Sequence, residues 1–328
     1  MQTSDAENAV NSQPSSRLGQ VRQRQNQAVL ITILAICVIT TLINPVFIKP
    51  TNLINIMRQI SILGIVASGM TILMISGGID LSVGAALSFA GVICGRILAS
   101  GYGELTAVVA GVAVGALVGL VNGTIVAKTR VQPFIATLGM MSILQGGALL
   151  VTRGRQIPNL DGAFFASLGG GMIGFIPVPV IILLTVVLTS HFLLQYTKWG
   201  RRWYALGGNE ETAFLSGVNV NRYKISVYVI TGVCVGIAAV TLASRIGAAL
   251  PLMGSGYELQ SIAAVVIGGV SLTGGRGNML GAFLGVLLLG VISNSLNMLN
   301  VSAFFQTMAV GVIILLAVIA NQYSQRRP

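Results

Sequence analysis

The residues that first suggest chemistry are Gly77–Gly84, whose sequence GGIDLSVG places a single carboxylate, Asp80, in a long apolar stretch. Residues 60–76 before it and 81–95 after it carry no other charge. A carboxylate at membrane depth costs on the order of 3 kcal/mol, so it is rarely kept there without a role. Four roles are open: Asp80 lines a translocation path, binds a coupling ion, caps the helix that follows, or is simply hydrated at a helix end near the membrane surface.

The paired glycines beside Asp80 predict a break between two helices. Gly77 and Gly78 have no side chain to strain, so the backbone can leave a helix at either position. Backbone groups freed at membrane depth are tolerated only where protein or a water-filled cavity covers them. We therefore take Gly77, Gly78, Asp80 and Ser82 as candidates for a pore or a gate.

The same pattern returns near the C-terminal end of the chain. Residues 268–275, of sequence GGVSLTGG, repeat the order GG-(I/V)-x-L-(S/T)-x-G, and Ser271 takes the place of Asp80. Transporters are often built from two related halves, with the substrate path near interrupted helices at corresponding positions. The echo predicts an internal duplication, either parallel or inverted, and adds Ser271 to the pore or gate candidates.

A second group of candidates lies in residues 196–224, the longest loop of mixed polarity between apolar segments. Asn209 suits a helix N-cap, the acidic pair after it favours the positive helix end, and the glycine that follows suits a helix stop. A short amphipathic helix that presents Ala213, Phe214 and Leu215 is a natural docking element, and the alternative is a helix that lies on lipid. The docking candidates are Asn209, Glu210, Glu211, Ala213, Phe214 and Gly217.

The composition places these candidates in a membrane protein. The chain has 328 residues, of which 54% are hydrophobic and 8% charged, whereas a soluble domain averages about 25% charged residues. The formal net charge of +11 does not indicate binding to nucleic acid, because the basic residues form short clusters between apolar runs instead of one continuous stripe. Such clusters are typical of cytoplasmic loops.

Apolar runs of about 20 residues predict an all-α, polytopic transmembrane bundle of about ten spans. Residues 1–27 are polar and predict a disordered cytoplasmic tail, residues 28–321 form the transmembrane domain with 196–224 as a cytoplasmic loop, and residues 322–328 form a second cytoplasmic tail. The expected spans are 28–47, 60–77, 80–99, 105–127, 132–152, 175–195, 225–247, 258–274, 278–296 and 303–321.

Ten spans with the N-terminus inside the cell place both termini in the cytoplasm. Thirteen of the 19 basic residues then lie inside and six lie outside, as the positive-inside bias requires. The six outside residues are Lys49, Arg58, Arg96, Arg153, Arg155 and Arg245.

The reactive residue types form no catalytic or metal-binding set. The three cysteines, Cys37, Cys94 and Cys234, lie singly inside apolar runs, where we expect small buried hydrophobes. The sole histidine, His191, lies near the end of an expected span. We therefore predict no catalytic residue and no metal site.

Four stretches of the chain, taken together, are specific for one family of proteins. They are Gly77–Gly84; VQPFIATLGM at 131–140; 200–221 with ALGGNE at 205–210; and 257–269 with YEL at 257–259 and IAAVVIGG at 262–269. Together they resemble the permease subunits of bacterial ABC importers for sugars, of the ribose, xylose and arabinose type. The resemblance covers about residues 28–321, which is nearly the whole chain.

The resemblance also assigns a role to the capped loop helix. In importers of this kind, Glu-Ala-Ala followed by three residues and then Gly marks the coupling helix, which sits in a groove of the ATPase subunit. The pattern is similar to Glu211-Thr212-Ala213 and Gly217 here, with Thr212 as a departure from it. No GxxxxGK(S/T) phosphate loop occurs in the sequence, so ATP hydrolysis belongs to a separate chain.

The partners follow from the same resemblance. It implies an ABC ATPase subunit that binds ATP, a periplasmic or lipoprotein sugar-binding protein, and a second permease copy in a homodimer, all at the bacterial inner membrane and its lipid. The chain itself then carries no cofactor and binds no nucleic acid. We expect a transport subunit and not an enzyme, which passes a monosaccharide inward, with a ribose-like pentose favoured.

Two alternatives stay open beside this reading. One is an ion-coupled secondary transporter that uses Asp80, and against it stands the absence of other intramembrane carboxylates that could form a relay. The other is a membrane-embedded enzyme, against which stand the single histidine and the lack of a metal cluster or a Ser/His/Asp set.

Overall fold

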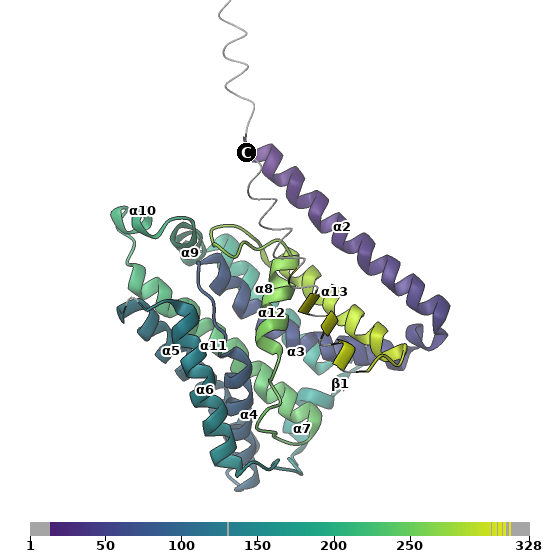
Figure 1. Cartoon of the computed structure of the whole chain (residues 1–328). Coiled ribbons are helices and arrows are strands. Elements are labelled where there is room, and N and C mark those ends of the chain that lie inside the picture. Colours follow the sequence, from purple (N-terminus) through teal and green to yellow (C-terminus); the bar gives the residue numbers. More distant parts are fainter. Residues whose placement is uncertain are drawn as a thin grey trace, which may run out of the picture.

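The computed structural model is almost entirely helical (Figure 1), which confirms the expected all-α class. It describes residues 14–129 and 131–302 and, beyond these, 304–306, 308–309, 311–312 and 315. A hairpin of two short antiparallel strands, β1 (Met172–Ile173) and β2 (Ile176–Pro177), is the exception within this part of the chain. The helices are α2 (Pro14–Ile43), η1 (Pro45–Ile48, a 3-10 helix), α3 (Pro50–Ile75), α4 (Val83–Ala99), α5 (Glu104–Thr129), α6 (Pro133–Thr152), α7 (Ala163–Gly170), α8 (Val178–Tyr196), α9 (Lys198–Gly208), α10 (Glu210–Leu215), α11 (Val220–Ile246), α12 (Tyr257–Ile267) and α13 (Met279–Met298).

Seven helices among the described residues are long and apolar enough to cross a membrane. They are α3, α5, α6, α8, α11, α13 and the Asn26–Ile43 part of α2. Two shorter apolar helices, α4 and α12, occupy the positions of the expected spans 80–99 and 258–274. The tenth expected span, 303–321, falls mostly outside the described residues.

Several helix ends differ from their predicted positions for local reasons. α3 begins at Pro50, well before residue 60, because proline suits the first position of a helix and the polar first turns hid it from a count of apolar residues. α12 ends at Ile267, before residue 274, because Gly269 has a φ of 86° that a helix cannot continue through. α2 begins at Pro14, inside the expected tail 1–27, of which residues 1–13 lie outside the described part.

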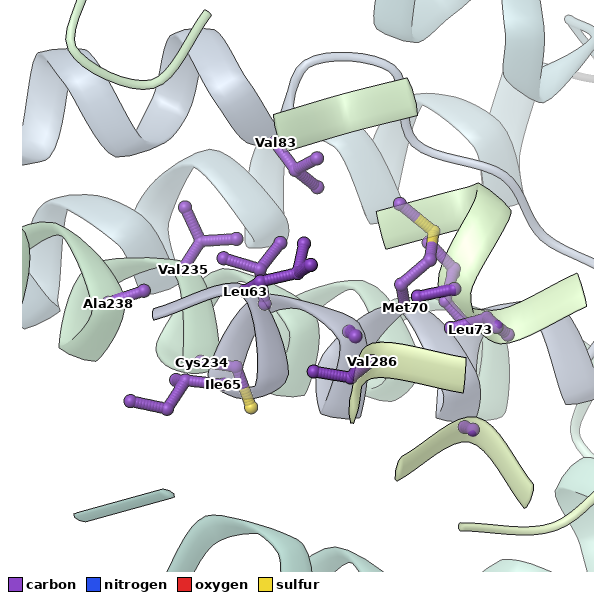
Figure 2. Packing of buried hydrophobic residues seen from close by; sticks show 14 of the residues in the cluster. Leu63, Ile65, Met70, Leu73, Val83, Cys234, Val235, Ala238 and Val286 are labelled. Atoms are coloured by element: carbon purple, nitrogen blue, oxygen red, sulfur yellow. The ribbon is translucent and has the colours of Figure 1, made fainter. Parts of the chain in front are cut away.

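The centre of the bundle is α3. Every residue of α3 from Ile60 to Ile75 is buried, and the helix packs against α8, α11, α12 and α13. Figure 2 shows Leu63 and Met70 of α3 in the same cluster as Val235 of α11 and Val286 of α13. A helix that is apolar on all sides belongs in the interior of a bundle. The C-terminal end of α3, where the first predicted break lies, is therefore surrounded by protein.

Glycines join α5 to α11 at very short range. They recur every four residues on α5, and they lie against backbone of α11. A Cβ at Gly115 would lie 2.3 Å from the carbonyl oxygen of Gly232, and a Cβ at Gly119 would lie 2.2 Å from that of Tyr228. Small residues allow such close backbone approach in lipid, where apolar attraction does not hold helices together.

One part of the bundle starts as irregular chain and continues as the short helix α12. Between α11 and α12 the chain runs back along α4, where Ala249 contacts Gly95 and the N–H of Gly254 donates to the hydroxyl of Ser88 at 2.9 Å. The irregular backbone between α11 and α12 is therefore packed against protein.

A second carboxylate lies at the start of α12. Glu258, in the first turn of this helix, accepts the N–H of Gly256 at 3.1 Å and its side chain packs against the backbone of Gly84 in α4. A negative charge at a helix N-terminus is favourable.

The bundle has two distinct ends. α8 leads from the β1–β2 hairpin to α9, and α11 begins where α10 ends, so α9 and α10 lie at one end and α7 with the hairpin at the other (Figure 1). We call these the α9 end and the α7 end. Since Gly77 and Gly275, just beyond α3 and α12, both contact the Gly207–Gly208 end of α9, α3 and α12 both run toward the α9 end.

Candidate functional site: two helix breaks and a docking helix

The first break begins where α3 ends. The N–H of Gly78 donates to the carbonyl of Leu73 at 3.0 Å, and the N–H of Gly77 donates to that of Met74 at 3.0 Å. Gly77 has a φ of 83°, so this is the Schellman arrangement, in which a left-handed residue after a helix satisfies its last carbonyls. The predicted break is confirmed, and Gly77 is the residue that makes it.

Asp80 is buried in this break, with 4% of its surface exposed. Its Oδ1 accepts the N–H of Ser82 at 2.8 Å and the hydroxyl of Ser82 at 2.6 Å. The amide Nδ2 of Asn122 donates to Oδ2 of Asp80 at 3.2 Å and to the hydroxyl of Ser82 at 2.8 Å. Asp80 therefore holds the residue that precedes α4 and does not cap the first turn of that helix, and its burial rules out a hydrated helix end.

Three other helices hold the break, through residues that the sequence does not single out. Asn122 comes from α5. Thr137 of α6 accepts the N–H of Leu81 with its hydroxyl at 3.2 Å, and Tyr228 of α11 donates its hydroxyl to the carbonyl of Ile79 at 3.1 Å. A fully buried amide at membrane depth needs a partner, and this is the signal that could have identified Asn122.

The second break, after α12, also ends its helix at a left-handed glycine, but one position later in the repeated pattern. Gly269, which aligns with Gly78 and not with Gly77, has a φ of 86°. The hydroxyl of Ser271 accepts the N–H of Thr273 at 3.2 Å and lies 2.8 Å from the hydroxyl of Thr273. In both breaks a side-chain oxygen binds the backbone N–H two residues further on, as Asp80 does with Ser82, which is a common way to fix a turn.

The two breaks meet through their backbones at the α9 end. The N–H of Gly275 donates to the carbonyl of Ile75, the last residue of α3, at 2.8 Å. A Cβ at Gly274 would lie 2.9 Å from the Cα of Gly77. The structure thus brings the loop that follows Ser271 against the start of the first break, and the pore or gate candidates belong to one region.

The helix α10, which carries the docking candidates, forms as its sequence predicts. The side chain of Asn209 accepts the N–H of Thr212 at 2.8 Å, and Gly217 follows the helix with a φ of 79°, which confirms the cap and the stop. Glu210 forms an ion pair with Lys224 of α11 at 2.7 Å. The pair fixes the start of α10 relative to the next long helix.

The docking candidates do not all face outward. Phe214 is 67% exposed, Leu215 is 78% exposed, and Glu211 is exposed, whereas Ala213 is 3% exposed. The expectation that Ala213 is presented to a partner is therefore wrong. A helix of six residues has to pack one side against its own chain, and Ala213 lies on that side. Phe214 and Leu215 form an apolar tip on the other.

α9, which precedes α10, was not predicted as a separate helix. Its Trp203 is buried and donates its indole N–H to the hydroxyl of Ser226 of α11 at 3.1 Å. The guanidinium of Arg202 lies 5.2 Å from the ring centre of Tyr223, within the range of a cation–π contact. α9 is therefore anchored to α11, and it carries α10 at its C-terminal end.

The described residues include no group of three or more His, Cys, Asp or Glu side chains that could hold a metal ion. In the same part of the chain the cysteines are unpaired. The described residues therefore offer hydrogen-bonded turns, two helix breaks and an exposed apolar tip on α10.

Residues 52–319 match the protein family described as "Branched-chain amino acid transport system / permease component". The chain belongs to this family. The permease is 42% identical over 304 residues to the ribose import permease protein RbsC of Escherichia coli K12, which covers 91% of this chain and 94% of that protein. It is 40% identical over 286 residues to RbsC of Bacillus subtilis 168, covering 87% and 89% of the two chains. It is 35% identical over 317 residues to the L-arabinose ABC transporter permease protein AraH of Azospirillum brasilense, covering 96% and 93%.

This membership confirms the resemblance drawn from the four stretches. The permease is the membrane component of an importer of the ABC sugar type, a transport subunit without an ATPase domain. An ABC permease carries no cofactor of its own, because ATP binds the ATPase partner, and it works with that ATPase and a binding protein. Its place is the bacterial inner membrane.

Proposed function

We propose that the permease passes a monosaccharide, with a ribose-like pentose favoured, into the cell along a path between two copies of the chain. The observation that carries the proposal is the 42% identity to a ribose import permease over 91% of the chain. The arabinose permease at 35% identity is also named for a pentose.

The chemistry of the breaks suits a neutral polyol. Their polar side chains are hydroxyls and amides, and the carboxylate of Asp80 is bonded to Ser82 and Asn122. In this structure Asp80, Ser82 and Ser271 are all buried, so we assign Gly77, Gly78, Asp80, Ser82 and Ser271 to a gate that closes the path at the α9 end and not to its open wall.

The proposed topology has ten spans, with residues 303–321 as the tenth and both termini in the cytoplasm. Basic residues support the cytoplasmic side for the α9 end, because they cluster there and positive charge is enriched in cytoplasmic loops. Those of α9 and the start of α11 are Lys198, Arg201, Arg202, Arg222 and Lys224.

The duplication predicted from the sequence echo is proposed only for the two breaks. Support comes from the bond that Asp80 and Ser271 each make to the N–H two residues further on, and from the shared direction of α3 and α12, which makes the relation parallel. The left-handed glycines, Gly77 and Gly269, do not occupy matching positions of the repeat. Beyond the turns the segments diverge, because α4 begins directly after Ser82 whereas α13 begins only after Asn278.

The exposed tip of α10 is the proposed contact with the ATPase. An apolar pair at the end of a capped cytoplasmic helix is suited to a groove in a partner protein. Phe214 and Leu215 supply the apolar surface, and Glu211 supplies a charge beside them.

Two other readings have specific support. The family description names branched-chain amino acids, which makes leucine a second candidate substrate. The buried carboxylate favours an ion-coupled carrier, but both oxygens of Asp80 already accept hydrogen bonds from the protein.

The direct test is uptake by a purified complex. The permease is co-purified with its ATPase and its binding protein, reconstituted into proteoliposomes, and supplied with ATP and radiolabelled ribose. We expect accumulation of ribose, competition by unlabelled pentoses, and none by leucine. Uptake of leucine in place of any sugar would contradict the proposal. If unlabelled hexoses compete with uptake and unlabelled pentoses do not, the favoured substrate is a hexose and not a pentose.

A further inference from the structure

Two backbone segments converge on Gly207, the second-last residue of α9. A Cβ at this position would lie 2.0 Å from the carbonyl oxygen of Ile75 and 2.6 Å from the nitrogen of Gly275. Those two atoms belong to residues that are themselves joined by a 2.8 Å hydrogen bond. The carbonyl oxygen of Gly207 would lie 2.8 Å from a Cβ at Gly274. α9 therefore touches the end of α3 and the loop of the second break at one point.

The convergence is a contact between main chains and not between side chains. Side chains can rotate away when a neighbour moves, whereas backbones in contact have no such freedom, because protein interiors are close-packed and have low compressibility. A displacement of α9 toward the bundle would therefore press on α3 and on the loop of the second break together.

α9 is also joined closely to the docking helix. A single residue, Asn209, separates α9 from α10, and its side chain caps α10. The hydroxyl of Tyr204 donates to the carbonyl of Gly277, in the loop after the second break, at 2.9 Å. α9 is thus held at its C-terminal half by two contacts to that loop and is followed at once by the tip that we assign to the ATPase.

We propose that Gly207 is the positioning residue through which movement of α10 reaches both helix breaks at once. The proposal rests on the function proposed above, in which α10 docks on the ATPase and the breaks form the gate. When the ATPases close on ATP, α10 carries α9 with it, and the Gly207 contact shifts the end of α3 and the loop 274–277 as a unit. Neither break then opens without the other.

The chain offers a matched pair of variants for the test. Gly207→Ala places a methyl group into backbone, whereas a Cβ at the neighbouring Gly208 meets no atom within 4 Å. Both changes make the same substitution at the C-terminal end of α9. In reconstituted complexes we expect Gly207→Ala to keep ATPase binding and ATP hydrolysis while the sugar moved per ATP falls about tenfold, a typical size for coupling between sites. Gly208→Ala should keep the ratio of the unchanged complex.

A distance measurement shows whether Gly207→Ala blocks the transmission of movement or only disturbs the packing of the helices. Spin labels on cysteines introduced at Arg276 and Lys128, both exposed, report the loop of the second break relative to α5. In the unchanged complex and in Gly208→Ala, a non-hydrolysable ATP analogue should change this distance, and in Gly207→Ala the change should be lost. An equal nucleotide response and equal coupling in the two variants would overturn the proposal.

If the Gly207→Ala permease fails to assemble with its ATPase, the variant Tyr204→Phe tests whether α9 transmits movement to the loop of the second break. It removes the hydrogen bond to Gly277 without adding bulk, and we expect a fall in sugar moved per ATP of about twofold to fivefold with assembly intact. An unchanged ratio for Tyr204→Phe would then overturn the proposal. Failure of the unchanged permease to bind an ATPase or to transport sugar would instead contradict the proposed function.

Discussion

At the scale of single residues, the structure defines the hydrogen bonds of the buried carboxylate. Asp80 accepts three of them, two from Ser82 and one from Asn122. The sequence pointed to Asp80 and Ser82, because a charge between glycines in an apolar run is conspicuous. It could not supply Thr137 or Tyr228, because their contacts to the break join residues far apart in the chain and depend on how whole helices pack.

The first prediction concerns the charge of Asp80. An amide at this position keeps one acceptor oxygen for Ser82 but turns an NH2 group toward the NH2 group of Asn122. We therefore expect Asp80→Asn to lower sugar uptake severalfold at an unchanged level of membrane-inserted protein. Asp80→Ala, which removes every acceptor, should also lower the amount of folded protein. Uptake by Asp80→Asn at the rate of the unchanged permease would show that the charge is dispensable.

The second prediction concerns Asn122, which only the structure identifies. Asn122→Leu leaves Oδ2 of Asp80 buried without its donor, and an unsatisfied buried polar group costs about 1–3 kcal/mol, more when charged. We expect a clear loss of thermal stability in detergent, measured by the temperature at which the protein aggregates. Thr124→Ala on the same helix is the control, because the hydroxyl of Thr124 bonds only to its own helix at Leu120. Equal stability of the two variants would contradict the account of this network.

At the scale of elements, local signals were predictable and contacts between elements were not. The cap at Asn209 and the stop at Gly217 follow from residue type alone, and so does the end of α3 at Gly77. α9 escaped prediction because its alternating basic and aromatic residues read as loop until Trp203 is seen buried against α11. The separation of α11 from α12 was predicted, but the packing of the segment between them along α4 was not, because it joins residues far apart in the chain.

The third prediction tests the docking tip. Phe214→Ser combined with Leu215→Ser removes the exposed apolar surface of α10 and leaves the permease core untouched, so we expect a strong loss of ATPase co-purification with normal membrane insertion. Glu211→Lys should act in the same direction, because it places a positive charge at the positive end of the helix. Ile173→Ser in the hairpin at the α7 end, where Ile173 is 65% exposed, is the control and should retain the ATPase. Full retention in the α10 variant would rule out this tip as the contact.

At the scale of the whole molecule, the bundle depends on backbone contact between helices. The sequence contains 41 glycines, and their number alone does not say which helices approach each other closely. The structure assigns this close approach to α5 with α11, and it places α3 at the centre, where its end and the two breaks are enclosed. The proposed gate therefore lies in close-packed surroundings, and the backbone contact at Gly207 is the route by which we propose that α9 moves it.

The fourth prediction compares two glycines in neighbouring helices. Gly115→Ala forces a Cβ toward the carbonyl of Gly232, and overpacking of this kind costs about 1–3 kcal/mol. A Cβ at Gly139 of α6 meets no atom within 4 Å, so Gly139→Ala should leave the stability of the purified permease unchanged. We expect Gly115→Ala to lower the temperature of thermal aggregation and the yield of monodisperse protein. The reverse order of the two variants would contradict the packing described for α5.

The account as a whole depends on ATP, supplied through α10, as the source of energy for transport. The measurement that tests this most directly is uptake of labelled ribose by proteoliposomes that contain the permease with its ATPase and binding protein, with the energy source varied. We predict that uptake continues when ionophores collapse every ion gradient and stops when ATP is withheld. Uptake that stops with the ion gradients and proceeds without ATP would contradict it and would return Asp80 to the role of an ion site.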